Sequence, residues 1–145
     1  RALVRELAAD RGLTLVFVTH DLRVVNFFCD RIAVMYMGRL VELGTRKQIM
    51  EESRHPYTRM LLSAAPRDEP GVEIDRPWVK NELDATAPLG NACNFAARCW
   101  ARQALGNPER CMTERPEDHP REDGRVVACH FEEQIPALAA AETAR

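Results

Sequence analysis

A short run near the N-terminus governs the architecture of this chain: Thr14-Leu15-Val16-Phe17-Val18-Thr19-His20. It is rich in β-branched and apolar residues and lacks polar alternation, which predicts a central parallel strand covered on both faces. Residues 2–10 before it have apolar residues at helical spacing, and Gly12 stands where a left-handed C-terminal cap is needed. A helix that leads directly into a buried strand is half of an α/β unit, so we expect an α/β fold.

The residues that follow predict a helix and a hairpin. Asp21 is a helix-capping residue type, and apolar residues then repeat at three-residue steps to Phe28. Two strand-like runs come next, residues 31–37 and 39–43. Gly38 between them permits the tight reversal of a hairpin.

Two more helices are expected before the chain becomes irregular. Thr45 and Gln48 have the spacing of a capping box, which predicts a helix from there to about Glu52. His55-Pro56-Tyr57 opens another helix, because proline is well tolerated in a first turn, and Pro66 ends it. We expect His55 to cap or pack this helix rather than to bind a ligand.

The composition describes an ordinary folded chain: 145 residues, 46% hydrophobic and 29% charged, with a net charge of -2. Its arginines are scattered among acidic residues, so we expect no nucleic-acid partner. The apolar runs are too short to span a bilayer, and no secretory signal is recognisable at the N-terminus. Because the first residue is Arg1 rather than Met, we expect the chain to start inside a helix of a longer protein.

Three segments together resemble a known family. Leu15-Val16-Phe17-Val18-Thr19-His20-Asp21-Leu22 is similar to the switch-histidine region of ABC ATPases, and residues 30–44 resemble the hairpin that follows it. Residues 55–64 resemble the extension peculiar to oligopeptide and dipeptide importer ATPases. The resemblance runs from about Ala2 to His130 and implies the C-terminal part of an ABC nucleotide-binding domain, a partial P-loop NTPase fold, with a small loop-rich cysteine extension.

His20 is the candidate catalytic and ATP-binding residue. It follows the predicted strand, at the sheet edge where α/β proteins bind ligands, although a lone histidine there is more often structural. The resemblance implies that in a closed dimer of subunits this side chain hydrogen-bonds the γ-phosphate and helps to hold the attacking water, with Asp21 as a cap and orienting neighbour.

Other parts of an ATP site are not found in the sequence. It contains no G-x-x-x-x-G-K-[ST] loop, no acidic strand end for Mg²⁺ and no Ser-Gly-Gly-Gln signature, all of which the family places before residue 1. We therefore expect ATP and Mg²⁺ as cofactors of the intact subunit, an ABC-type ATPase, and little ATP binding or hydrolysis by this chain alone.

Four cysteines form the second candidate site: Cys93, Cys99, Cys111 and Cys129. By spacing alone, a metal site and four unrelated thiols are equally good interpretations, and His119 or His130 could replace one thiolate in a zinc site. The resemblance implies that the four cysteines ligate a [4Fe-4S] cluster, with zinc as the alternative. Nearby Arg98, Arg102 and Arg110 would lower the thiol pKa values and offset the negative charge of the cluster.

These observations predict four segments. Residues 1–66 form the end of the nucleotide-binding domain, 67–90 a proline-containing linker, 91–131 the cysteine-rich extension and 132–145 a tail.

The resemblance implies a subunit that couples ATP hydrolysis to the import of di- or oligopeptides at the cytoplasmic face of the membrane. Its partners would be a second ATPase subunit, transmembrane permease subunits and, indirectly, a substrate-binding protein. Two alternatives remain open. One is a truncated, non-catalytic module that binds a metal and a partner, and the other is an ABC subunit for nickel, glutathione or an oligosaccharide.

Overall fold

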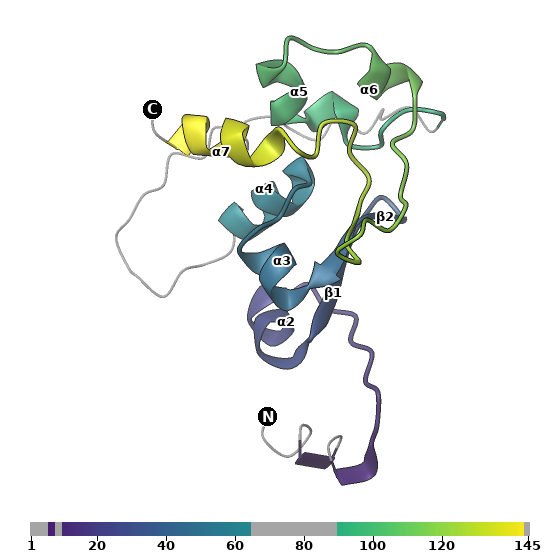
Figure 1. Ribbon diagram of the computed structural model, residues 1–145, viewed down its shortest axis with the longest axis vertical. Helices are drawn as coiled ribbons and strands as arrows, with labels where there is room; N and C mark the ends of the chain where they lie inside the picture. The colour runs from purple at the N-terminus through teal and green to yellow at the C-terminus, as the bar shows by residue number, and fades with distance from the viewer. Residues whose placement is uncertain (1–5, 8–9, 65–89, 144–145) are drawn as a thin grey trace.

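The computed structural model describes residues 6–7, 10–64 and 90–143. Most of the predicted first helix, the predicted linker up to Leu89 and the helix end at Pro66 lie outside the described residues. What is described is a mixed structure of short helices around a small antiparallel sheet (Figure 1).

The sheet confirms the predicted hairpin. Strands β1 (Arg31–Tyr36) and β2 (Arg39–Thr45) pair antiparallel, and β3 (Val126–Val127) adds to β2 from far along the chain, so the order is β1-β2-β3. The turn places Met37 at φ 46° and Gly38 at φ 74°. Two successive left-handed residues are the geometry of a tight two-residue hairpin, which explains the glycine.

The helices before the cysteines begin where their caps predict. Helix α2 (Leu22–Phe28) is capped by the side chain of Asp21, which accepts a hydrogen bond from the backbone of Arg23. Helix α3 (Arg46–Met50) starts at the predicted capping box and ends slightly before the expected Glu52. Helix α4 (Pro56–Ala64) starts at the expected proline.

The cysteine region consists of short helical turns. It holds the 3₁₀ helix η2 (Ala96–Arg98), α5 (Trp100–Ala104) and α6 (Arg110–Thr113), and β3 then leads into α7 (Ile135–Thr143). Within the described residues, the structure contains no helix of the length and apolar character needed to cross a membrane.

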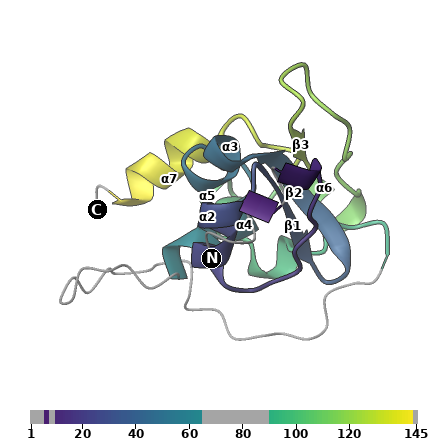
Figure 2. The same cartoon turned by 90° about the horizontal axis from the view of Figure 1, so that it is seen from below.

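The core has two clusters that share side chains. One consists of Ile32, Val34, Val41 and Ile49, which come from the hairpin and α3. Figure 2 shows α3 beside the hairpin. The other gathers Phe95, Cys99, Trp100, Ala101, Ile135 and Ala139 around the cysteines. Tyr36 and Tyr57 pack against both clusters, so the hairpin, α4 and the cysteine region are joined by continuous apolar contact.

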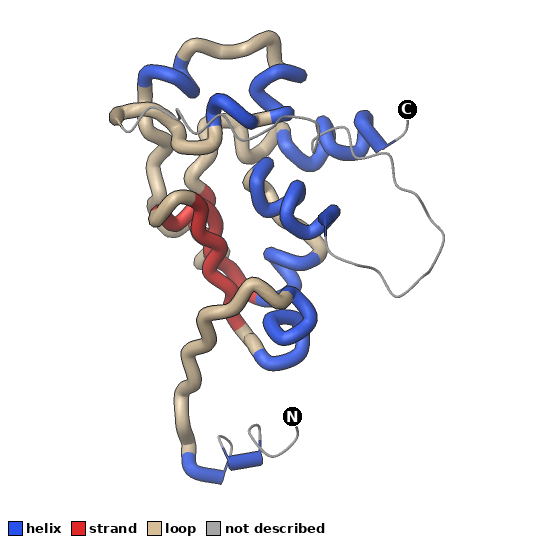
Figure 3. The backbone as a smooth tube through the Cα atoms, turned by 180° about the vertical axis from the view of Figure 1, so that it is seen from behind, coloured by secondary structure: helices blue, strands red, loops and turns tan. Residues whose placement is uncertain are grey.

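The expected central strand at residues 14–19 does not form. This segment is irregular and runs away from the sheet as a long connection (Figure 3). Val16 is 87% exposed and Val18 100% exposed. A central parallel strand needs hydrogen-bonding neighbours on both sides, and no strand among the described residues pairs with it. The predicted strand and the predicted burial of residues 14–19 are therefore wrong in this structure.

Candidate functional site

The four cysteines of the extension come from four separate local structures. Cys93 lies in the loop before η2, and Cys99 caps α5 by accepting a hydrogen bond on Sγ from the backbone of Arg102 at 3.4 Å. Cys111 lies within α6, and Cys129 follows β3. The backbone N–H of Cys93 donates to the carbonyl of Cys111 at 3.0 Å, which ties the first loop to α6.

All four thiols nevertheless face the same cavity. The side chains lining it include these cysteines together with His55, Arg102 and His130. Within the described parts of the chain, no group of three or more Cys, His, Asp or Glu side chains is arranged to hold a metal ion. The four cysteines therefore line one common space, but among the described residues they are not gathered at a single ion site.

Burial keeps these thiols protonated. It raises the pKa of Cys99 to about 12 and also raises the pKa values of Cys93, Cys111 and Cys129. Mutual repulsion adds to this effect, since the pKa of Cys129 is raised further by the other three cysteines. Without a cation to share their charge, the four groups remain neutral and poorly nucleophilic.

The three arginines expected near the ligands behave differently from one another. Arg102 and Arg110 act on Cys111, where their positive charge opposes the larger effect of burial on its pKa. Arg98 lies instead near Tyr57, whose pKa it lowers against the effect of burial. The expectation that arginines would lower the thiol pKa values overall is wrong here, because desolvation outweighs them.

The two histidines that were alternative zinc ligands lie in different places. His130 lines the cavity, and its Nε2 lies 3.1 Å from the carbonyl of Glu114. His119 is an exposed side chain, 3.7 Å from the carboxylate of Glu117. Only His130 is placed with the cysteines.

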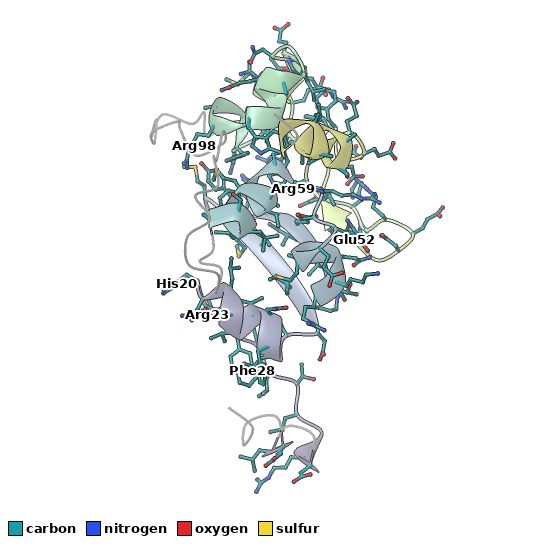
Figure 4. All side chains as sticks on the ribbon, turned by 90° about the vertical axis from the view of Figure 1, so that its left-hand side faces the viewer. His20, Arg23, Phe28, Glu52, Arg59 and Arg98 are labelled. Carbon is teal, nitrogen blue, oxygen red and sulfur yellow. The ribbon has the colours of Figure 1, made fainter. Side chains whose placement is uncertain are left out.

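His20 lies at the start of α2, away from the cysteine region (Figure 4). It is exposed and follows the irregular segment, so it does not stand at the carboxyl end of a strand. Beside it, the Thr19 hydroxyl accepts a hydrogen bond from the backbone of Asp21 at 3.0 Å. The structure therefore presents the imidazole to solvent.

One buried carboxylate was missed by the sequence analysis. Glu42 has no exposed surface, and its two oxygens accept hydrogen bonds from the backbone of Arg54 at 2.7 Å and of His55 at 3.2 Å. It thereby fixes the chain just before α4. The available signal was a lone acidic residue between Val41 and Leu43 in an apolar strand.

A buried arginine was missed as well. Arg125 is 1% exposed, donates to the carbonyl of Glu52 at 2.8 Å and pairs with the Glu52 carboxylate at 3.5 Å. It joins the segment before β3 to the end of α3. No pattern in the sequence distinguishes it from the many exposed arginines.

Comparisons with known proteins agree with the resemblance. The sequence pattern of a family described as the C-terminal region of oligopeptide/dipeptide transporters matches residues 41–105. The chain is 38% identical over 127 residues to the dipeptide transport ATP-binding protein DppF of Haemophilus influenzae, covering 88% of this chain and 37% of that protein. It is 34% identical over 129 residues to the oligopeptide transport ATP-binding protein OppF of the same organism, again covering 88% and 37%.

The chain is therefore similar to one class of protein, the ATP-binding proteins of peptide transporters. Within that class, residues 41–105 match the C-terminal region of the oligopeptide/dipeptide transporter family. The chain spans about 37% of the length of the curated relatives it matches.

Proposed function

We propose that this chain is the C-terminal part of an ATP-binding subunit that couples ATP hydrolysis to import of di- or oligopeptides. The match of 88% of the chain to relatives named for dipeptide and oligopeptide transport carries the proposal. The subunit would lie at the cytoplasmic face of the membrane, against transmembrane permease subunits and a second ATPase subunit, and receive peptide indirectly from a substrate-binding protein.

We assign the phosphate-sensing role to His20. Phosphoryl transfer depends mainly on positioning and on stabilising charge at the γ-phosphate. An exposed imidazole next to a capped helix suits this role, because the remaining walls of an ATP pocket would come from other parts of the subunit and from its neighbour. The side chain would affect the rate of hydrolysis more than the affinity for nucleotide.

A chimaera tests this assignment. The matching segment of the Haemophilus influenzae protein DppF is replaced by this chain, and ATP binding and hydrolysis are compared in the parent chimaera and its His20→Ala variant. We expect hydrolysis to fall about 100-fold while ATP binding is retained. The matched control His119→Ala, a change at another exposed histidine, should alter neither. Equal hydrolysis by the parent and His20→Ala would refute the role of His20.

For the cysteine cavity, we propose that Cys93, Cys99, Cys111 and Cys129 hold a [4Fe-4S] cluster. The donor set fits, since four thiols surround one space and a cubane presents its irons to four separate ligands. Bound iron would also offset the burial and the mutual repulsion that together keep the thiols protonated. Such a cluster supplies a one-electron redox centre or a structural staple.

Metal analysis of anaerobically purified chain tests this proposal. We expect a brown protein with about four irons and four sulfides per chain, and loss of both in Cys111→Ser. The control Cys29→Ser changes a cysteine that packs against the hairpin core instead, and it should keep the iron. A colourless protein that binds one zinc ion would overturn the cluster assignment.

A further inference from the structure

The His55-Pro56-Tyr57 motif has no part in the phosphate chemistry proposed above. It opens α4, and His55 and Pro56 both line the cysteine cavity. Each of its three residues contacts a residue that is a close sequence neighbour of a proposed ligand. The contacts are different in kind, so they can be tested one by one.

His55 reaches the segment of Cys129. Its side chain is buried, and Nδ1 accepts a hydrogen bond from the backbone of Tyr57 at 3.1 Å. In a neutral imidazole the proton is then on Nε2. The backbone of Ala128 also raises the pKa of His55 against the larger effect of burial, which is the effect of a hydrogen-bond acceptor close to the ring. Ala128 immediately precedes Cys129.

The other side of the Cys129 segment is held by the sheet. The backbone N–H of Ala128 donates to the carbonyl of Val41 at 2.9 Å, continuing the pairing of β2 with β3. Ala128 is thus held through its N–H by the hairpin, and its backbone lies next to His55. Both anchors belong to residues before the cysteine region.

Pro56 and Tyr57 reach the segments of Cys99 and Cys93. The carbonyl of Pro56 accepts a hydrogen bond from Nε1 of the buried Trp100 at 3.1 Å, and Trp100 directly follows Cys99. The ring of Tyr57 packs edge-on against Phe95, with centroids 5.5 Å apart. Phe95 is 1% exposed and lies two residues after Cys93.

We propose that the His55-Pro56-Tyr57 motif is a platform that positions the cysteines for metal binding, with His55 setting the position of Cys129 through Ala128. Cys111 is outside its direct reach and is held through Cys93 instead. The metal readouts of this inference rest on the cluster proposed above. Its thiol readouts do not, because they are made on metal-free protein.

The test compares variants of the full chain. His55→Leu fills a similar space but donates no hydrogen bond, whereas His55→Gln keeps a donor near the position of Nε2. Trp100→Phe removes the N–H that reaches Pro56 together with part of the buried ring system, and keeps one aromatic ring in the core. Ile49→Ala is the matched control. Ile49 is 1% exposed and belongs to the hairpin cluster, which contains none of the four cavity cysteines.

Two quantities are measured for each variant. The alkylation rate of every cysteine in chelator-treated protein is followed with iodoacetamide and peptide mass spectrometry, and iron per chain is measured after anaerobic purification. In His55→Leu we expect Cys129 to react about tenfold faster relative to Cys111, because the polar contact of residue 55 with Ala128 is lost. Iron content should fall. His55→Gln should restore both values.

Trp100→Phe and Ile49→Ala test whether the change in alkylation rate is confined to Cys129 in His55→Leu. Trp100→Phe should speed alkylation of Cys99 rather than of Cys129. Ile49→Ala should lower the unfolding midpoint yet keep the relative rates of the four thiols and the iron content. The positioning role is wrong if the alkylation rate of Cys129 is the same in His55→Leu and in the wild type. It is also wrong if His55→Leu and Ile49→Ala both speed alkylation of all four cysteines to the same extent. If the wild-type chain contains no iron, the cluster is rejected. If His55→Leu then still speeds the alkylation of Cys129 selectively, the platform is supported.

Discussion

Glu42 and His55 show how much depends on two buried polar side chains. The carboxylate satisfies the backbone N–H groups of Arg54 and His55, and the imidazole satisfies that of Tyr57. Buried donors without partners are costly, so these contacts hold the entrance to α4 in one conformation. Burial raises the pKa of Glu42 and lowers that of His55, which disfavours the charged form of both.

The pKa of His55 gives a pH dependence of stability. Burial lowers this pKa from 6.5 to about 3 in the folded chain, whereas the unfolded chain takes up the proton near pH 6.5. The unfolded state therefore binds more protons between these values. We expect the free energy of unfolding to fall as pH drops from 6.5 toward 3, by up to about 1.4 kcal/mol per pH unit.

Urea unfolding at a series of pH values measures this effect. His55→Gln lacks the titrating group, so its stability should fall less steeply over the same range. Glu42, the carboxylate next to His55, titrates in both proteins and largely cancels in the comparison. Equal slopes for the wild type and His55→Gln would show that His55 does not contribute.

The same residues show what sequence reasoning could and could not find. His55 was predicted as a capping or packing residue, and the structure confirms this. Its contact with Ala128 was not predictable, because it joins positions far apart in the chain that only the β2 and β3 pairing brings together. The roles of His20 and of the four cysteines as site residues stay predictions.

At the scale of elements, local signals were dependable where a short motif determines the backbone. Asp21, Gly38 and the capping box of Thr45 and Gln48 each mark a boundary that the structure confirms. The prediction of a strand at residues 14–19 is wrong, because a central strand is stabilised by neighbouring strands and not by its own residues alone. β3 was not predicted, since it has only two residues.

The hairpin turn gives a prediction at this scale. Gly38 has φ 74°, and an added Cβ would meet no atom within 4 Å, so the only penalty for Gly38→Ala is backbone strain. We expect it to lower the free energy of unfolding by about 1 kcal/mol, measured by urea denaturation. Gly90→Ala is the control, because its site is equally open without a left-handed φ. A Gly38→Ala protein as stable as wild type would contradict the observed turn.

At the scale of the whole molecule, the cysteine region is packed against other elements, whereas apolar residues near the N-terminus are exposed to solvent. The cysteine region is tied to the hairpin by β3, to the segment after α3 by Arg125, and to α4 by the ring of Tyr57. Residues 13–18 instead expose Leu13, Val16 and Val18. In the intact subunit we expect this apolar run to become the central strand that its sequence predicts.

This expectation can be tested with a single charge. In the chain alone, Val18→Asp should change the free energy of unfolding by less than about 0.5 kcal/mol, because Val18 is 100% exposed. In the chimaera with DppF the same change would bury a carboxylate, so we expect loss of folded, ATP-binding protein. The conservative Val18→Ile should be tolerated in both. A fully active Val18→Asp chimaera would mean that the segment is not a buried strand.

Peptide uptake is the most direct measurement of the proposed function. The chimaera is produced in Haemophilus influenzae cells that lack their own DppF, and uptake of a labelled dipeptide is followed with and without His20→Ala. The account predicts that the chimaera restores uptake and that His20→Ala, made in equal amount, abolishes it. Uptake that is unaffected by His20→Ala, or a stable ATP-hydrolysing chimaera that imports no peptide, would contradict it.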